Sequence, residues 1–255
     1  MYGLEAKLYE QLCKLRDKYD LQGIKAEFEA EGSMFRDLVR LRRITDRAGI
    51  GLYLKIGGVE AVRDIKDALE IGVDGLVAPM AESVYGLKKF IDAYRSIYND
   101  HKIHLSINVE TRNAVEAIDA ILEYAAGNLD NITVGRSDLS RSYFDEDIFP
   151  DSDFILDLLE TIGEKCRQHG LTLTVGGSIS ARTIERIAQR PRLQKLIFKL
   201  ETRKIILPTP VMLSTPAVLN EALKFEELYI LSKKELSDLF IKSEIARLTE
   251  LQWRK

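Results

Sequence analysis

Short segments of alternating apolar and polar residues are separated by longer helix-like patterns along this chain. The first helix is predicted over residues 4–19, where leucines recur at helical spacing. Behind it, strand-like and helix-like segments alternate at a spacing typical of βαβ units, which predicts a parallel sheet. The predicted strands cover residues 23–29, 51–56, 73–79, 104–110, 131–135, 171–176 and 195–201. The predicted helices between them cover residues 35–48, 59–71, 83–98, 112–126, 153–169 and 180–189.

The polarity of these strands distinguishes a closed barrel from an open sheet. Strands buried on both faces of an open sheet are nearly continuous in apolar residues. Here the apolar residues alternate with polar ones, as in the first strand with Ile24, Ala26 and Phe28 against Lys25, Glu27 and Glu29, and in the seventh with Leu196, Phe198 and Leu200 against Ile197, Lys199 and Glu201. The alternation predicts an apolar outer face covered by helices and a charged lumen, and hence a (β/α)8 TIM barrel of the α/β class.

The end of the chain differs from the rest. Seven strands are clear, and the eighth lies either in residues 203–207 or in a short segment that reads as a loop. From residue 208 the pattern changes to helices only, over residues 216–231 and 233–252. Without repeats or flexible linkers, residues 1–255 are expected to form a single barrel domain. Residues 208–255 form its C-terminal helical tail, which could cap the barrel or pack on another subunit.

Composition narrows the classes of function. The chain has 255 residues and a net charge of −3, with basic and acidic residues mixed along it, which argues against nucleic acid as a partner. Two cysteines in a chain of this length indicate a reducing compartment rather than a disulfide framework. Residues 1–20 lack the features of a signal or transit peptide, and no apolar run approaches the roughly 18 residues of a membrane span. We therefore expect a soluble, cytoplasmic protein with no membrane partner.

Charged residues on the predicted inner face need a partner or a ligand, because a buried isolated charge is costly. The inward positions hold Lys25, Lys55, Lys199, Glu27, Glu29, Glu110 and Glu201. Low in the barrel they could form a structural lattice of ion pairs without any ligand. At the C-terminal ends of the strands a functional role is favoured, because barrel enzymes place their chemistry there.

Two carboxylates stand at the ends of adjacent strands. Glu110 ends the strand in INVETRNA (107–114), and Asp138 follows the next strand in the predicted loop of ITVGRSDLS (132–140). Parallel neighbouring strands bring both to one rim, where two carboxylates with open positions for water suit Mg²⁺ or Mn²⁺. Such a metal can chelate a 2-oxo acid and stabilise its enolate. Spacing alone does not single out this site, because such pairs are common in acidic proteins.

Three segments, taken in order, resemble the HpcH/HpaI aldolase/citrate lyase family of metal-dependent barrels in the phosphoenolpyruvate/pyruvate superfamily. They are GVDGLVAPM (72–80), VETRNA (109–114) and GRSDLS (135–140), within a resemblance over about residues 49–142. The resemblance implies that Glu110 and Asp138 bind the metal and that the backbone around Ser137 and Asp138 holds the substrate carboxylate. With Ser137 we assign Arg136 to substrate binding. The family also commonly exchanges a late helix between subunits, so a homo-oligomer is expected.

The chain departs from the family pattern at two places. Lys55 stands where the aldolases carry an arginine that polarises the keto oxygen, and lysine lacks the bidentate fork of arginine. The Glu-His pair of an early strand has no counterpart, since residues 27–31 read EFEAE and His101, His104 and His169 lie elsewhere. His101 and His104 precede a strand and are expected at the surface. Glu27 or Glu29 could take over the acid/base role.

Two further features bear on the substrate. The glycine-rich turn VGGS (175–178) opens a helix, so Gly177 could present backbone N–H groups to an anion or form an ordinary tight turn. Beyond the seventh strand, Arg203 or Lys204 could bind a phosphate or carboxylate distal to the broken bond, or belong to a solvated rim.

The sequence as a whole predicts a metal-dependent carbon-carbon lyase of the aldolase type that acts on a 2-oxo acid through a metal-stabilised, pyruvate-like enolate. An aldehyde or a phosphorylated compound is a candidate for the second substrate. Three alternatives remain: a CoA-ester lyase of the citrate lyase type, a Schiff-base aldolase that uses an inward-facing lysine, and a non-catalytic module that binds a 2-oxo acid.

Overall fold

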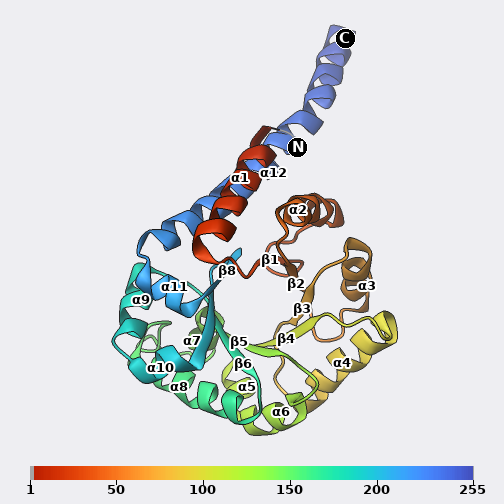
Figure 1. Ribbon diagram of the computed structural model, residues 1–255. Coiled ribbons are helices and arrows are strands. Elements are labelled where there is room, and N and C mark those ends of the chain that lie inside the picture. The colour runs from red at the N-terminus through yellow and green to blue at the C-terminus, as the bar shows by residue number, and fades with distance from the viewer. Residues whose placement is uncertain (1–2, 255) are drawn as a thin grey trace.

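A computed structural model describes residues 3–254 and shows a closed barrel of eight strands in chain order, with helices around it (Figure 1). The TIM-barrel prediction and the seven predicted strands are confirmed. The strands are β1 Gly23–Glu27, β2 Leu52–Lys55, β3 Gly75–Ala78, β4 His104–Val109, β5 Asn131–Gly135, β6 Thr172–Gly176, β7 Ile197–Glu201 and β8 Ile205–Pro208. The helices are α1 Gly3–Tyr19, α2 Phe35–Ala48, α3 Val62–Ile71, α4 Val84–Tyr98, α5 Arg112–Glu116, α6 Ile118–Ala125, α7 Arg136–Arg141, α8 Asp153–Gln168, α9 Ala181–Ala188, α10 Pro191–Leu196, α11 Thr209–Ser214 and α12 Ala217–Trp253.

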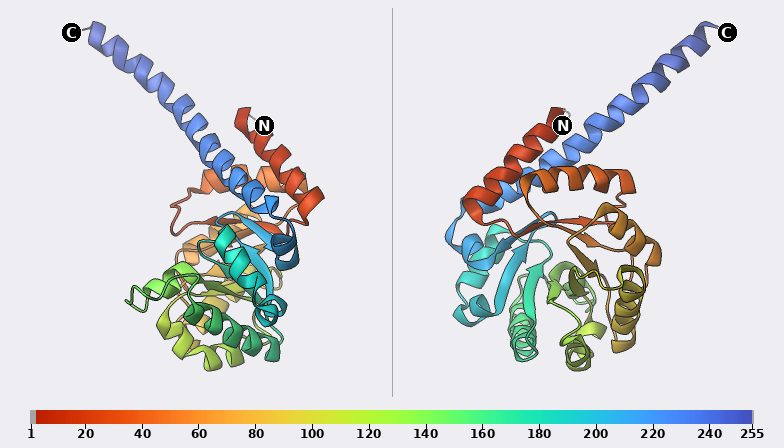
Figure 2. Two further views of the ribbon diagram at one scale, coloured as in Figure 1. Left: turned by 90° about the vertical axis from the view of Figure 1, so that its left-hand side faces the viewer. Right: turned by 45° about the vertical axis from the view of Figure 1, so that its right-hand side comes forward.

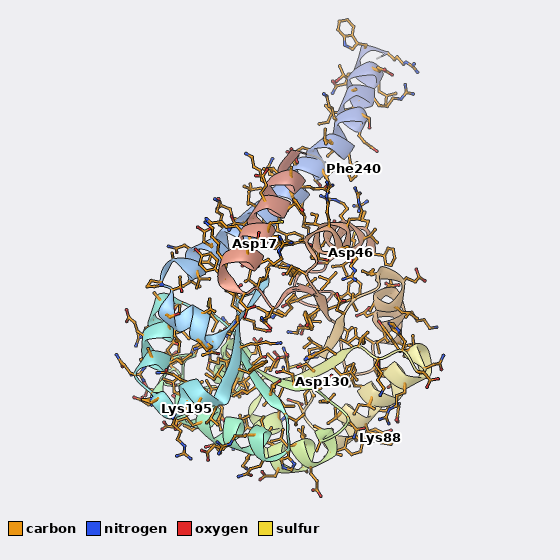
Figure 3. The ribbon with its side chains drawn as sticks, viewed as in Figure 1. Asp17, Asp46, Lys88, Asp130, Lys195 and Phe240 are labelled. Atoms are coloured by element: carbon orange, nitrogen blue, oxygen red, sulfur yellow. The ribbon has the colours of Figure 1, made fainter. Side chains whose placement is uncertain are left out.

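The hydrophobic core lies between the sheet and the surrounding helices. The outward residues Ile24, Leu54, Ile107 and Ile132 have no exposed surface and belong to one continuous cluster of buried side chains. Each such side chain contributes about 1.5–3 kcal/mol by leaving water. The polar residues between them face the lumen, and the drawn side chains fill the space inside the ring of strands (Figure 3). The predicted alternation is therefore observed in these strands.

Local chemistry sets several helix boundaries. The side chain of Ser83 accepts a hydrogen bond from the N–H of Gly86 at the start of α4, and Ser180 accepts one from Thr183 at the start of α9. Gly49 and Gly72 adopt left-handed conformations directly after α2 and α3. These residue types are recognisable in the sequence, and the predicted helices end within a few residues of these positions.

The eighth strand differs in direction from the others. β8 confirms a strand near residues 203–207 but runs antiparallel to both β7 and β1, so the sheet is not purely parallel as expected. Only residues 202–204 separate β7 from β8. A parallel crossover needs a dozen or more residues, whereas an antiparallel hairpin needs only a few. The short connection therefore dictates the reversed strand.

The region around β7 also departs from the predicted pattern. Residues 191–196 form α10, and the strand begins at Ile197 rather than at residue 195. The register between β6 and β7 shifts, with Leu173 opposite Ile197 and Thr174 opposite Lys199, so Phe198 is the extra residue of a bulge. Phe198, expected to pack outward in the core, is 55% exposed. Ile197, expected to face inward, is buried in the core cluster instead.

Three helical regions also differ from the prediction. The helix expected over residues 112–126 is divided into α5 and α6 at Ala117, and the loop expected after β5 contains α7. In the tail, α11 is followed by one continuous helix of 37 residues, α12, in place of two helices. No residue between 217 and 253 is a proline or glycine, so nothing in the backbone interrupts α12.

Helix α12 links the barrel to a projecting arm. Its first half lies beside α1, and its second half extends away from the barrel (Figures 1 and 2). Among residues 3–254, no helix is both long and apolar enough to cross a membrane.

Candidate active site

A cavity of about 690 Å³ lies at the C-terminal ends of the strands. Eight residues predicted to bind metal or substrate, or to act in catalysis, line its wall: Glu27, Glu29, Lys55, Glu110, Ser137, Asp138, Gly177 and Arg203. They come from distant segments of the chain, and the closed barrel brings them together. The position agrees with the general placement of active sites in barrel enzymes.

Arg136 is the exception among the predicted substrate-binding residues. Its side chain has no exposed surface and does not line the cavity. The guanidinium donates to the carbonyl oxygens of Gly176 and Gly177 at 3.1 and 2.7 Å and to the Asp151 carboxylate at 2.6 Å. The N–H groups of the guanidinium are thus bound to protein groups that lie outside the cavity. The expected substrate contact of the Arg136 side chain is wrong, because adjacent residues of α7 point in different directions and Ser137 takes the cavity side.

Glu110 is almost completely buried, with 2% of its surface exposed. Its Oε1 accepts a hydrogen bond from the N–H of Met80 at 3.1 Å, and its Oε2 accepts one from the Asn108 amide at 3.0 Å. The Lys55 ammonium lies 3.7 Å from Oε2. Burial raises the pKa of Glu110 above its ordinary value, against the opposing effects of Lys55 and of these two hydrogen bonds. The carboxylate is thus a desolvated anion whose stability depends on nearby positive charge.

Close packing of β5 fixes where Glu110 can lie. A Cβ atom on Gly135 would stand 2.7 Å from Oε2 of Glu110 and 3.1 Å from its Cβ. Only glycine leaves room for the carboxylate at this place. The glycine that precedes the RSD segment is therefore part of the site.

Asp138 lies on the same cavity wall in a different environment. It belongs to the first turn of α7, and half of its side-chain surface is exposed. The nearest cation is Arg141, at 3.8 Å. The Asp138 carboxylate is therefore open to a ligand, in contrast to the enclosed Glu110.

Alternating charges cover the floor of the cavity. Lys25 Nζ lies 2.8 Å from Glu201 and 3.2 Å from Glu27, and Lys55 Nζ lies 2.6 Å from Glu29. Burial alone would lower the pKa of Lys25, but Glu201 and Glu27 raise it above its ordinary value. Burial likewise opposes the raised pKa of Lys55, which Glu110 and Glu29 produce. Both lysines are therefore held as ammonium ions.

The turn that contains Gly177 packs directly against α7. Gly177 has φ +80°, and a Cβ there would lie 2.6 Å from the backbone nitrogen of Ser137. The hydroxyls of Ser137 and Ser178 are 2.7 Å apart. These contacts join the ends of β5 and β6 into one rigid part of the wall.

Reasoning from the sequence missed other residues of the wall as site residues, among them Met80, Asn108, Arg141, Leu223 and Glu226. Asn108 had a signal, because it precedes Glu110 by two residues and therefore faces the same side of β4. Leu223 and Glu226 belong to α12, and nothing in their local sequence connects them with the barrel mouth.

None of the three histidines lines this cavity. His104 begins β4 and lines a chamber of about 20 Å³ together with Lys199 and Tyr53. The His104 ring packs edge-on against Tyr53, and its buried Nδ1 has no hydrogen-bond partner in residues 3–254. Burial lowers the pKa of His104. His104 is therefore half-buried rather than fully at the surface, since the first residue of an inward-facing strand can already point into the lumen, whereas His101 is exposed as expected.

The residues present fit a divalent cation that takes most of its ligands from water and substrate. In residues 3–254, no three His, Cys, Asp or Glu side chains form a cluster able to hold a metal ion. A protein usually supplies one or two carboxylate ligands to a bound Mg²⁺, and Glu110 and Asp138 offer two. The buried Oδ1 of Asn108 also lacks a hydrogen-bond partner beside Glu110. This set of oxygen donors suits Mg²⁺ or Mn²⁺ rather than zinc.

Comparison with known proteins identifies the family. The family model described as HpcH/HpaI aldolase/citrate lyase matches residues 49–175, which include β2 to β5 and both carboxylates. These residues place the chain in the HpcH/HpaI aldolase/citrate lyase family. The chain thus belongs to a family of lyases that act on small molecules. No curated protein matches its sequence.

Solved structures resemble this HpcH/HpaI family member in fold. An HpcH/HpaI aldolase from Desulfitobacterium hafniense is 18% identical, with a TM-score of 0.60 over 76% of this chain and 82% of that one. An HpcH/HpaI aldolase/citrate lyase family protein from Burkholderia cenocepacia is 14% identical, with a TM-score of 0.61 over 86% and 89%. The citrate synthase SbnG is 20% identical, with a TM-score of 0.56 over 72% and 78%.

Proposed function

We propose that the protein is a divalent-metal-dependent carbon-carbon lyase of the aldolase type, and that its substrate is a 2-oxo acid. The observation that carries this proposal is the pair of carboxylates, Glu110 and Asp138, on the wall of one cavity with Lys55 beside Glu110. The family supplies the reaction class, since its members are lyases and usually depend on a divalent metal.

The charge of the cavity supports a cation. Its wall carries six carboxylates, Glu27, Glu29, Glu110, Asp138, Glu201 and Glu226, against four cations, Lys25, Lys55, Arg141 and Arg203. The excess of two carboxylates matches one divalent ion. Mg²⁺ or Mn²⁺, bound by Glu110 and Asp138, would supply a Lewis acid that chelates the carboxylate and keto oxygen of the substrate.

The other residues are assigned to the organic chemistry. The Lys55 ammonium, kept protonated by its carboxylate neighbours, donates a hydrogen bond to the keto oxygen and stabilises the negative charge that develops there. Ser137 and the backbone near Gly177 orient the substrate carboxylate. Glu29 takes a proton from the carbon next to the keto group, since its side chain is partly open to the cavity and contacts Lys55.

Carbon-carbon bond formation then needs no further reagent. The enolate carbon attacks the carbonyl carbon of an aldehyde, and the aldehyde oxygen takes the proton back from Glu29. The product is a 4-hydroxy-2-oxo acid, and the lyase direction reverses these steps. Glu27 is the second candidate proton carrier. Burial alone would raise the pKa of Glu27, but Lys25 and Lys55 lower it, so Glu27 stays ionised and is a weak base for a proton on carbon.

A Schiff-base reaction has less support. It requires a neutral lysine, and the raised pKa values of Lys25 and Lys55 oppose that state. Burial lowers the pKa of Lys199, but Lys199 lines the small chamber with His104 and not the cavity that holds Glu110.

The decisive experiment measures Mn²⁺ binding and aldol turnover in Glu110→Gln and Asp138→Asn. We expect Mn²⁺ affinity and activity to fall more than about 100-fold, beyond the usual effect of changing a residue that only supports a ligand. Glu116→Gln, which removes an exposed carboxylate from α5, serves as the control and should change neither. Full activity after complete removal of metal would refute the proposal.

We also propose that the protein forms a homo-oligomer through α12. The projecting half of this helix carries a row of exposed apolar side chains, Ile241, Ile245, Leu248 and Leu251, which line one shallow groove. A contiguous apolar surface of this kind is rare on monomers.

A further inference from the structure

The turn that follows β1 carries two carboxylates with different partners. Glu29 lines the cavity, and its carboxylate lies 2.6 Å from Lys55 Nζ. Glu31, two residues later, does not line the cavity, and its carboxylate is bound to the Lys204 ammonium. The N–H of Gly32 donates to the carbonyl of Glu29 at 3.1 Å, so Glu29 and Glu31 belong to one tight turn. A contact that fixes Glu31 therefore also fixes the backbone of Glu29.

Lys204 connects this turn to two other parts of the molecule. Its side chain is 1% exposed and does not line the cavity. The ammonium is bound to Glu31 and lies 4.4 Å from the centre of the Tyr229 ring of α12. The backbone carbonyl of Lys204 accepts a hydrogen bond from the N–H of Lys25 in β1 at 2.8 Å. Lys204 is thus held by the barrel and in turn holds the side chain of Glu31.

Helix α12 supplies the third side of this cluster. Tyr229 is 5% exposed, and its ring faces the Lys204 ammonium. Glu226 lies three residues earlier on the same helix and lines the cavity. Residues three apart are neighbours on the surface of a helix. The side of α12 that borders the cavity therefore also packs against Lys204.

The pair of Lys204 with Glu31 is not the arrangement that stability alone would favour. Burial lowers the pKa of Lys204, and the charge of Glu31 only opposes this effect. The Oε1 atom of Glu31 is buried and has no hydrogen-bond partner among residues 3–254. Apolar side chains can often replace a buried ion pair without loss of stability, whereas such a pair can fix one arrangement of the elements around it. The two buried charges therefore suit a role in holding the turn in one position.

We propose that Lys204 is a positioning residue for proton transfer: through Glu31 it holds the turn of residues 29–32 and keeps the Glu29 carboxylate at the cavity. This inference rests on the proposed function, in which Glu29 takes the proton, and adds the residues that place this base. A proton carrier acts only within hydrogen-bond reach of its target. Because Lys204 does not line the cavity, its loss should impair proton transfer and leave the binding of metal and pyruvate nearly unchanged.

The test follows the exchange of the methyl protons of pyruvate for deuterium in D2O with Mg²⁺, measured by proton NMR. This reaction reports proton transfer and needs no aldehyde. Lys204→Met should lower the exchange rate about 10- to 100-fold, as expected when a reacting group is displaced by about 1 Å. Calorimetric titration should give nearly the same affinity for Mn²⁺ and for oxalate. Lys233→Met is the control, because Lys233 lies 5.6 Å from the centre of the Tyr229 ring but pairs with Asp37, and it should retain the full rate.

A double variant separates positioning from stability. Lys204→Met alone leaves the buried Glu31 carboxylate without its cation, which lowers the thermal unfolding midpoint. Glu31→Gln combined with Lys204→Met removes both charges and should restore part of the midpoint. The exchange rate should stay low in the double variant, because the turn is no longer bound to Lys204. Recovery of the rate together with the midpoint, or an unaltered rate in Lys204→Met, would overturn the inference.

The turn can also be tested without any catalysis. Absence of pyruvate exchange in the unchanged protein would contradict the role of Glu29 in the proposed function rather than the contact of Lys204 with the turn. Cleavage by glutamyl endopeptidase after Glu29 and Glu31, measured by mass spectrometry, then decides, because a protease cuts a segment only when it opens locally. We expect this cleavage to be about tenfold faster in Lys204→Met than in the unchanged protein or in Lys233→Met. Equal cleavage rates in the three proteins would show that Lys204 does not hold the turn.

Discussion

Lys25 lies between two carboxylates on the wall of the cavity. Its ammonium is buried between Glu201 and Glu27, so each charge has a partner in a region from which water is largely excluded. Removing one partner from such a cluster is more damaging than removing the whole cluster, because the remaining charges stay buried without compensation.

Lys25→Met is therefore expected to lower the free energy of unfolding by about 3–5 kcal/mol at neutral pH, as measured by urea denaturation. Lys88→Met is the matched control, since the pair of Lys88 with Asp92 is exposed on α4 and should contribute little to stability. Equal losses in the two variants would contradict a special role for burial.

The effect of Lys25→Met should also depend on pH. The pKa of Glu27 in the folded protein is lowered from its ordinary 4.5, so its ionised form stabilises the fold above that value. This stabilisation is lost as pH falls through the lowered pKa, because the carboxylate becomes protonated. The difference in stability between the two proteins should therefore shrink as pH falls below 4.5, and a constant difference would count against the ion-pair explanation.

The sequence predicted which residues belong to the site better than it predicted how their side chains are oriented and buried. Strand alternation identified Glu27, Lys55 and Glu110 as inward-facing, and a motif added Asp138. The alternation could not show that the Arg136 side chain points away from the cavity, because the direction of a side chain on the short helix α7 depends on tertiary packing. Nor could it separate Arg203 from Lys204, which are adjacent in the chain but differ in burial.

Neighbouring strands of the barrel limit how far the backbone of β5 can move. β5 is held by β4 on one side and by β6 on the other, with Val134 opposite Val109 and Gly135 opposite Gly176. The backbone at Gly135 therefore has little freedom to move away from Glu110. A side chain at position 135 would displace the carboxylate rather than the strand.

Gly135→Ala is thus expected to weaken Mn²⁺ binding at least about tenfold and to cost about 1–3 kcal/mol of stability through overpacking. Isothermal titration with Mn²⁺ and thermal unfolding measure the two effects. Gly58→Ala provides the comparison, because a Cβ at Gly58 would meet no atom within 4 Å. Unaltered Mn²⁺ affinity in Gly135→Ala would show that Glu110 does not bind the metal from this position.

The elements that were predicted incorrectly share a physical cause. Polarity patterns report which face of an element is buried, but they carry no information about direction or continuity. β8 could be located from its apolar residues, whereas its antiparallel direction follows from the three-residue connection to β7. Similarly, the tail was expected as two helices that meet at residue 232, but α12 continues through this position, since the lysines that follow it are good helix formers.

The whole molecule consists of a barrel and an arm that leaves it. Figure 2 shows the second half of α12 free of the barrel, and Figure 3 marks Phe240 near the beginning of this part. A second copy of the same helix is a partner of matching chemistry, because an apolar row can pair with itself across a two-fold axis.

Sedimentation of the unchanged protein should accordingly show an oligomer at micromolar concentration. Changing Ile245 to Glu together with Leu248 to Lys keeps the net charge and should release monomers, because burying these charges at an interface is costly. Lys242→Glu, outside the apolar row of α12, is the control and should leave the oligomer intact. A monomeric unchanged protein would contradict the proposed assembly.

The hairpin between β7 and β8 has a consequence for the evolution of specificity. Between the other consecutive strands of the barrel the connections include helices, and changes there disturb packing around the sheet. Residues 202–204 carry no such helix, yet two of them, Thr202 and Arg203, line the cavity. Lengthening a surface turn costs little free energy. Relatives that diverge at this turn could exchange one substrate for another while keeping the same scaffold, and directed evolution of this enzyme can begin there.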